Sequence, residues 1–295
     1  MFLTLSYFCI IINLGDVMLV NSNEMLMNAK KENSVVYQFN INNLEWTKFI
    51  LEKCNELKVP VILGASEGAI KYMGGYNVVA SLVKSMIEDL SIQIPVCLHL
   101  DHGSSFDSCK KAIDAGFSSV MIDASKFELK ENIEKTKEVV LYAHEHNVSV
   151  EAEIGHVGGM EDGVCGNILL ASYDECLEFV NETNLDSLAP AIGTVHGIYK
   201  GELNIDFNLI KELNNGLSVP LVMHGGSGLG DDVLKHAIEC GINKININSD
   251  LQDVWHKAVC DFIKENPSVY DPRKVISSGR GAIWTLIEQK INIVK

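Results

Sequence analysis

The sequence predicts an α/β protein built as a single (β/α)8 TIM barrel with eight parallel strands and C-terminal helices. From residue 35 onward, short runs rich in β-branched residues alternate with longer amphipathic runs. The apolar runs are nearly continuous, as in Val219–Met223, which is typical of parallel strands buried on both faces. An open doubly wound sheet is the alternative architecture that this alternation leaves open.

Eight runs are expected to form the barrel strands, in the order in which the chain reaches them. They are Val35–Phe39, Val59–Ala65, Pro95–Asp101, Ser118–Asp123, Val148–Ile154, Ser187–Ala191, Val219–His224 and Lys244–Asn248. Amphipathic patterns predict helices between strands, among them Asn43–Leu57, Ser104–Ala115 and Leu129–His146.

Glycine marks two of the expected helix ends, because Gly116 and Gly241 each lie between a helical run and a strand. Beyond the last strand, residues 250–295 are predicted to be mostly helical, with a turn at Tyr270–Arg273. No composition shift or linker divides the chain, so a single domain is expected over residues 18–295.

Residues 1–17 are largely apolar and need a separate interpretation. They lack the basic start and the small-residue cleavage site of a signal peptide. Asn13, Gly15 and Asp16 interrupt the apolar run, which makes it a poor membrane span. We interpret residues 1–17 as a short N-terminal extension, or as a misassigned start upstream of Met18, rather than as a targeting segment. The first helix is expected to open at Ser22.

The charge and the cysteines limit the partners and the compartment. Against 24 basic residues stand 39 acidic ones, so the formal net charge is −15. Such a surface disfavours nucleic acids and anionic membranes, and an anionic substrate then needs a local site. The eight cysteines are scattered without C-x-x-C spacing, which is typical of a reducing compartment. We expect a cytoplasmic protein with no nucleic-acid or membrane partner.

Polar residues follow six of the expected strands. In a (β/α)8 barrel the reactive groups lie at the carboxyl ends of the strands, so these residues share one face. The recurrence predicts an active site there, built from His99–Gly103, Asp123–Ser125, Glu153–Gly163, Gly193–Gly197, His224–Gly228 and Asn246–Ser249.

Three histidines in this set, His102, His196 and His224, are each followed by glycine. A single histidine is more often a hydrogen-bonded core or loop residue, but three at matching positions favour a metal site. Three imidazoles with an open fourth position are typical of catalytic zinc. The other six are expected to support the ligands (His99, His156) or to lie on helix surfaces (His144, His146, His236, His256).

Four carboxylates lie at the same strand ends. Asp101 directly precedes a proposed ligand, where it could exchange a proton with a substrate hydroxyl. Glu161 lies in the glycine-rich run 158–163, which we expect to be a mobile loop that closes over a ligand. Asp123 and Glu153 could contact the metal or orient its ligands.

Two loops predict a phosphate site. Gly225–Gly228 precedes a helix that begins near Asp231, and Asn246–Ser249 precedes one that begins near Asp250. Exposed amides at a helix N-terminus bind phosphate without a lysine cluster. The loops after strands seven and eight are the usual phosphate site of a barrel.

Four runs in the same order resemble class II fructose-bisphosphate aldolases and the related tagatose-bisphosphate aldolases. They are Leu98–Ser104, Gly158–Gly163, Gly193–Gly197 and His224–Gly228. The similarity extends from about residue 18 to the C-terminus. It implies a lyase that reversibly splits fructose 1,6-bisphosphate into dihydroxyacetone phosphate and glyceraldehyde 3-phosphate, with one catalytic zinc ion.

The resemblance also implies residue roles. It makes His102, His196 and His224 the zinc ligands. Asp101 becomes the acid/base on the C4 hydroxyl, and Glu161 the residue that moves the enediolate proton. Asp123 and Glu153 fall on alternative or supporting metal positions, which leaves a second metal site open. The substrate, phosphate and monovalent-cation positions are Asn40, Ser66, Gly197, Lys200, Gly225, Gly226, Ser227, Asn246, Asn248, Ser249 and Arg280.

The resemblance further implies a homodimer or homotetramer, with Arg280 donated across a dimer.

Alternatives to this chemistry remain open. Lys244 is the one lysine considered for Schiff-base chemistry, and a structural or counter-ion role is the favoured interpretation. Tagatose 1,6-bisphosphate is the alternative substrate, although Asn246–Gln252 is more similar to the fructose type. A metal-dependent hydrolase is disfavoured because the first strand has no His-x-His, and a non-catalytic or surface-binding paralogue is the remaining alternative.

Overall fold

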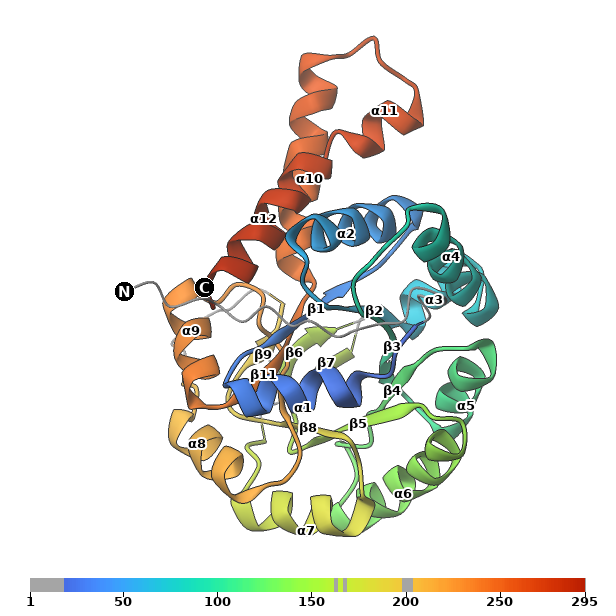
Figure 1. Ribbon diagram of the computed structural model, residues 1–295. Helices are drawn as coiled ribbons and strands as arrows, with labels where there is room; N and C mark the ends of the chain where they lie inside the picture. Colours follow the sequence, from blue (N-terminus) through green and yellow to red (C-terminus); the bar gives the residue numbers. More distant parts are fainter. Residues whose placement is uncertain (1–18, 162–163, 167–168, 198–203, 295) are drawn as a thin grey trace.

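The computed structural model describes residues 19–161, 164–166, 169–197 and 204–294. Its parallel strands form the predicted closed barrel, in the order β1-β11-β10-β8-β5-β4-β3-β2 (Figure 1). Each expected run contains a strand whose ends differ from the prediction by no more than two residues. The strands are β1 Val36–Asn40, β2 Val61–Ser66, β3 Val96–Gly103, β4 Ser119–Ile122, β5 Ser149–Ile154, β8 Ser187–Pro190, β10 Leu221–Met223 and β11 Ile242–Ile247.

Helices surround the strands, and the three predicted helices are confirmed as α2, α5 and α6. Asparagine or serine side chains cap the amino ends of α2 and α5, where Asn43 and Ser105 accept backbone N–H groups. The helices that follow β1 to β10 are α2 Leu44–Leu57, α3 Glu67–Met73, α4 Tyr76–Asp89, α5 Phe106–Ala115, α6 Leu129–Glu145, α7 Tyr173–Thr183, α8 Phe207–Gly216 and α9 Asp231–Cys240.

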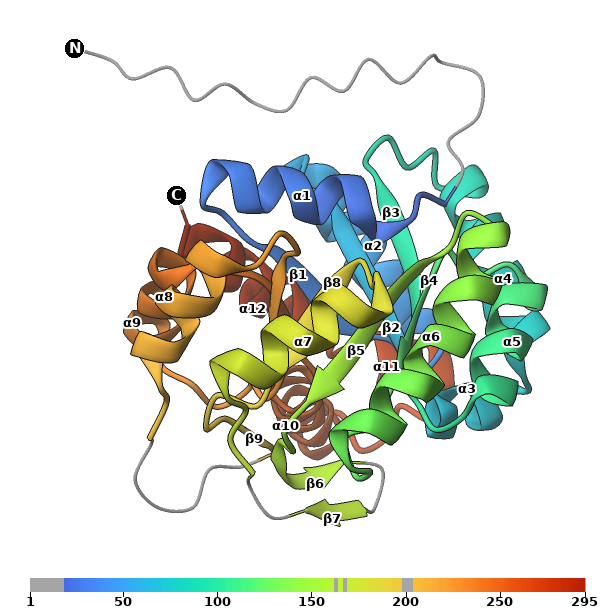
Figure 2. The same cartoon turned by 90° about the horizontal axis from the view of Figure 1, so that it is seen from below.

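The first helix, α1 (Ser22–Glu32), begins at the predicted residue and lies across one end of the barrel (Figure 2). Its buried residues Met25 and Leu26 pack against Val36 and Ile62 at the start of the strands. The backbone N–H of Ser22, at its amino end, donates to the Ser149 hydroxyl, and the two serine hydroxyls share a second hydrogen bond. The amino end of the barrel is therefore covered, which leaves the opposite end for a site.

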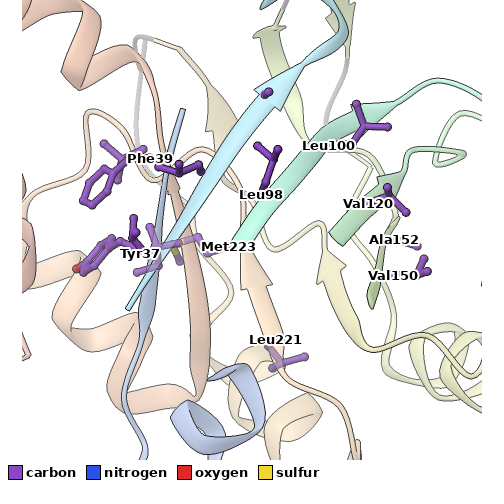
Figure 3. Close-up of a cluster of buried hydrophobic side chains, with 14 of the residues drawn as sticks. Tyr37, Phe39, Leu98, Leu100, Val120, Val150, Ala152, Leu221 and Met223 are labelled. Carbon is purple, nitrogen blue, oxygen red and sulfur yellow. The ribbon is translucent and has the colours of Figure 1, made fainter. Parts of the chain in front are cut away.

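Alternation along the strands separates an apolar outer layer from a polar interior. On β3, Leu98 and Leu100 join the apolar layer between strands and helices (Figure 3). His99 and Asp101 alternate with them and are buried among polar partners inside the barrel. The same alternation on β1, β5 and β11 buries further polar side chains: Gln38, Asn40, Glu151, Glu153 and Lys244.

A small sheet beside the barrel mouth includes residues 158–161, where the sequence predicted a loop; residues 162–163 lie outside the described residues, and closure over a ligand stays a prediction. The chain forms β6 (Gly158–Glu161), which pairs with β7 (Val164–Gly166) and with β9 (Val195–His196). Figure 2 places β6 and β7 at the end of the barrel opposite α1. The glycine-rich run gives no local strand signal, so pairing with β9 makes the strand.

The last three helices confirm the predicted helical tail. They are α10 (Ser249–Glu265), α11 (Pro272–Ser277) and α12 (Arg280–Asn292), and Figure 1 shows α10 running outward from the barrel and α12 returning. The predicted turn Tyr270–Arg273 is only partly right, because Pro272 and Arg273 already belong to α11 and Asp271 caps that helix. Among the described residues, no helix is long and apolar enough to cross a membrane.

Strand β3 continues two residues beyond its predicted end, and its pairing with β4 becomes irregular between Leu100 and Gly103. His102, within this irregular stretch, has a left-handed backbone with a φ of 51°. Gly103 follows in close contact, because an added Cβ would lie 2.5 Å from the Met121 carbonyl oxygen and 2.9 Å from Leu100 Cδ2. This backbone geometry sets the direction of the His102 side chain.

Gly103→Ala is therefore expected to lower the free energy of unfolding by about 1–3 kcal/mol, because backbone at Met121 must move. Gly281→Ala in α12 is the matched control, since nothing lies within 4 Å of its added Cβ. The control should be neutral or stabilise the chain by up to about 1 kcal/mol. Urea unfolding followed by fluorescence measures both, and equal stability of the two variants would contradict the packing argument.

Candidate active site

Three histidines from separate parts of the chain meet at the uncovered end of the barrel. His102 lies on β3, His196 on β9, and His224 directly after β10. One nitrogen of each ring lies within 4.8 Å of those of the other two. Their ring centroids are separated by 5.1 Å (102–196), 4.7 Å (102–224) and 5.8 Å (196–224). The structure thus brings together the three side chains that the sequence singled out.

Close approach of two backbones places His224 beside His196. Gly225 has a φ of +68°, and an added Cβ would collide with the carbonyl oxygen of Val195, the neighbour of His196. An added Cβ on Gly226 would meet Ile245 Cγ2 at 2.5 Å. Only glycine allows both the left-handed backbone and this proximity, which explains the glycine after this histidine.

Carboxylates hold two of the three rings. His102 Nδ1 lies 3.0 Å from Asp123 Oδ2, and Asp123 Oδ1 accepts from the Ser125 hydroxyl. Burial alone would raise the pKa of Asp123, but hydrogen bonds from His102 and Ser125 hold it below its usual range. His224 Nδ1 lies 3.1 Å from Glu153 Oε2. Asp123 and Glu153 therefore sit where supporting carboxylates were predicted.

Glu151 is a site residue that sequence reasoning missed. Its Oε1 lies 3.0 Å from His224 Nε2, and its Oε2 accepts from Lys244 Nζ at 2.7 Å. Burial would raise the pKa of Glu151, but the charge of Lys244 and the hydrogen bond from His224 outweigh it and lower the pKa. Lys244 makes the counter-ion contact that the sequence favoured. The polar alternation of β5, Glu-x-Glu, was the available signal.

His99 lies next to the Glu151–Lys244 pair. It supports the barrel interior rather than the rings of His102, His196 and His224 directly. Its Nδ1 is 2.8 Å from the Ser119 hydroxyl, and its Nε2 is 4.0 Å from Glu151 Oε2. Burial and the nearby charge of Lys244 lower the pKa of His99 to about 3. The ring is therefore neutral at physiological pH.

The surroundings of His224 favour its protonated ring in the metal-free protein. Burial favours the neutral ring, but the hydrogen bonds to Glu151 and Glu153 prevail and raise the pKa of His224 to about 9. A cation that binds this ring must displace that proton.

Asp101 is held by amides on both sides of the barrel. Asn40 Nδ2 donates to its Oδ2 at 2.7 Å, and Asn246 Nδ2 lies 3.4 Å from its Oδ1. Gln38 Nε2 donates to Asn40 Oδ1 at 3.2 Å, which fixes the orientation of the Asn40 amide. The carboxylate is 1% exposed, so its position next to His102 is tightly defined.

The two predicted anion loops lie side by side. The Ser227 hydroxyl accepts from the backbone N–H of Asn248 at 3.0 Å and of Asp250 at 3.3 Å. The backbone N–H of Gly228 donates to Asp250 Oδ1 at 2.8 Å. Ser249 opens α10, so the helix N-terminus faces the loop that begins at His224.

Some of the remaining predicted site residues lie within the described part of the chain and others lie outside it. Ser66 caps α3 by accepting from Ala69 N at 3.2 Å. Arg280 is exposed at the start of α12, its guanidinium over the Trp284 ring, and no described contact joins it to the histidines. His156 Nδ1 reaches the Ser125 hydroxyl at 3.1 Å, as expected of a supporting residue. Lys200 and the Glu161 side chain lie outside the described residues; Gly197 follows β9.

The donor set fits a divalent transition metal. Three imidazole nitrogens within 4.8 Å of one another are close enough for small side-chain movements to bring them onto one tetrahedral ion. His102, Asp123 and Glu153 form a second group with the same spacing. A carboxylate on the far nitrogen of a ligating histidine is the usual outer support of such a site, and Asp123 at His102 Nδ1 fits this role. Both ring nitrogens of His224 contact carboxylates, so an ion bound to this ring displaces one of the two contacts.

A closed parallel barrel with three histidines and buried carboxylates at its carboxyl end defines a metal-dependent barrel enzyme. The family described as "Fructose-bisphosphate aldolase class-II" matches residues 20–295. The chain therefore belongs to the class II fructose-bisphosphate aldolase family, which confirms the predicted family and the predicted lyase class.

Individual relatives agree with this assignment. The fructose-bisphosphate aldolase of Geobacillus stearothermophilus is 52% identical over 274 residues, which cover 92% of this chain and 96% of the relative. That of Staphylococcus epidermidis is 49% identical over the same length. Among solved structures, the YdjI aldolase from Escherichia coli K12 has a TM-score of 0.81 at 32% identity, covering 94% of this chain and 97% of its own.

Glu151→Gln should weaken zinc binding by about 10- to 100-fold, because the amide disturbs both the Lys244 pair and the support of His224. Competition with a fluorescent chelator measures the affinity. Glu182→Gln is the matched control, since Glu182 is exposed and pairs only with Lys137 in the described contacts. Wild-type affinity in the Glu151 variant would show that Glu151 does not support the site.

Zinc binding should also depend on pH. Below about pH 9 the proton on His224 competes with the metal, so affinity should rise by about tenfold per pH unit toward pH 9 and level off above it. Calorimetry in buffers of different ionisation enthalpy would detect the released proton. A pH-independent affinity between pH 7 and 9 would contradict the protonated state of His224.

Proposed function

We propose that this enzyme reversibly cleaves fructose 1,6-bisphosphate to dihydroxyacetone phosphate and glyceraldehyde 3-phosphate with one zinc ion held by His102, His196 and His224. The observation that carries this proposal is the meeting of three imidazoles beside the buried carboxylate of Asp101. Zinc is proposed because an all-imidazole, tetrahedral donor set suits it. The relatives' names favour fructose over tagatose 1,6-bisphosphate, the alternative substrate.

A zinc ion bound there supplies a Lewis acid for the ketone oxygen of the substrate. In the cleavage direction Asp101 takes the proton of the C4 hydroxyl as the C3–C4 bond breaks and the aldehyde forms at C4. Asn40 and Asn246 hold the two oxygens of Asp101 and so orient it for this transfer. Glu161 then gives a proton to C3, which completes dihydroxyacetone phosphate. Its position on β6, beside β9 and His196, supports that role.

The carboxylates of Asp123 and Glu153 orient two ligand rings in this proposal, and with His102 they offer a second metal position. The phosphate groups bind at the helix N-termini after the last two strands, where backbone amides compensate for the acidic net charge. The residues proposed for phosphate, substrate and monovalent-cation contacts are Asn40, Ser66, Gly197, Lys200, Gly225, Gly226, Ser227, Asn246, Asn248 and Ser249.

We also propose a homodimer or homotetramer in which the partner supplies Arg280. The projecting helices α10 to α12 carry Arg280 and present exposed Ile263 and Tyr270. Mass photometry should give a particle of twice or four times the 32.5 kDa chain. A monomer with full activity would contradict the donation of Arg280.

A coupled assay on fructose 1,6-bisphosphate tests the activity. Chelation should abolish turnover and zinc should restore it, whereas borohydride with dihydroxyacetone phosphate should leave the enzyme active because no Schiff base forms. Asp101→Asn should lower kcat by about 10²- to 10⁴-fold, and Asp107→Asn in the exposed first turn of α5 should not. Turnover in a metal-free preparation would contradict the mechanism, and preference for the tagatose sugar would contradict the substrate.

A further inference from the structure

The last helix returns to the two anion loops and buries a lysine against them. Lys290, near the end of α12, is 3% exposed. Its Nζ lies 3.5 Å from Asp231 Oδ1 and 3.6 Å from Asp250 Oδ2. Asp231 opens α9 and Asp250 lies in the first turn of α10, so one ammonium group contacts the amino ends of both helices. Gln289 Nε2 also donates to Asp231 Oδ2, at 2.9 Å.

Asp250 transmits this contact to the glycine-rich loop. Its Oδ2 faces Lys290, while its Oδ1 accepts from the backbone N–H of Gly228 at 2.8 Å. Its own backbone N–H donates to the Ser227 hydroxyl, which also accepts from Asn248 N. The carboxylate therefore links the loop after β10 to the start of α10, and Lys290 fixes the carboxylate from the other side.

The negative charges beside the two loops explain why an anion site there needs Lys290. Acidic residues in the first turn of a helix stabilise the helix, but they compete electrostatically with an anion bound at the same terminus. Asp231 and Asp250 place two such charges beside the proposed phosphate loops. A nearly buried cation between them compensates part of that charge with little screening by solvent.

We propose that Lys290 is a positioning residue for phosphate binding: it neutralises and orients Asp250 and thereby fixes the backbone at Ser227 and Gly228. The inference rests on the proposed function, because these loops are taken to be the phosphate site. Lys290 does not touch the phosphate itself. Its loss acts on binding more than on the chemical step, since Asp101, His102 and His196 lie on other elements and His224 lies at the far end of the loop, next to β10.

Stability alone cannot test this role, because replacing one member of a buried ion pair lowers stability whether or not it serves binding. The direct readout is calorimetric titration of the zinc-loaded full chain with inorganic phosphate, alongside steady-state kinetics. Lys290→Met should weaken phosphate binding about tenfold and raise KM similarly, with kcat changed by less than about threefold. Lys290→Arg retains the charge and should restore most of the affinity.

Lys264→Met is the matched control, because Lys264 is exposed on α10 and pairs with Asp261 three residues away. It should bind phosphate like the wild type. If Lys290→Met does not fold, as judged by circular dichroism and zinc content, Lys290→Gln carries the same expectation. Phosphate affinity unchanged in a folded Met or Gln variant would overturn the inference, as would an Arg variant as weak as the Met variant.

The titration also separates this inference from the proposed function. A wild-type chain that binds phosphate in a Lys290-dependent way but does not cleave the sugar would refute the aldol reaction and leave the role of Lys290 standing. A chain that cleaves the sugar while phosphate binds equally well to wild type and the Met variant would leave the reaction standing and refute the role of Lys290.

Discussion

The site depends on one buried ion pair across the barrel interior. Glu151 on β5 and Lys244 on β11 meet at 2.7 Å, and the second oxygen of Glu151 lies 3.0 Å from His224. Removing two charges from water is costly, and this pair is tolerable because both Glu151 oxygens are engaged, one by Lys244 and the other by His224. The ion pair thereby fixes the Glu151 carboxylate beside the ring of His224, which lies at the barrel mouth.

Backbone geometry at the mouth complements that interior pair. The left-handed His102 on the irregular end of β3 and the close packing of Gly225 against Val195 bring separate loops within reach of one ion. The Asn40 and Asn246 amides then place Asp101 next to the same point. The strand ends and β9 thus place the three histidines and Asp101 around one point, as expected of a preorganised site.

The sequence predicted correctly those features that depend on local patterns of residues. Strand alternation predicted the barrel, and histidines at strand ends predicted which rings meet. Glu151 was missed because its role depends on Lys244, 93 residues away in the chain. Strand β6 was missed because its glycines have no strand preference, and the strand depends on pairing with β7 and β9. Arg280 lies over the Trp284 ring, and its proposed contact with phosphate stays a prediction.

The most direct test of the central claim is zinc K-edge X-ray absorption on the zinc-loaded protein. Three converging imidazoles predict a first shell of nitrogen and oxygen only, at about 2.0–2.1 Å, with the outer-shell scattering of three histidine rings. A sulfur shell near 2.3 Å, or scattering from fewer than two rings, would contradict a metal centre built by His102, His196 and His224.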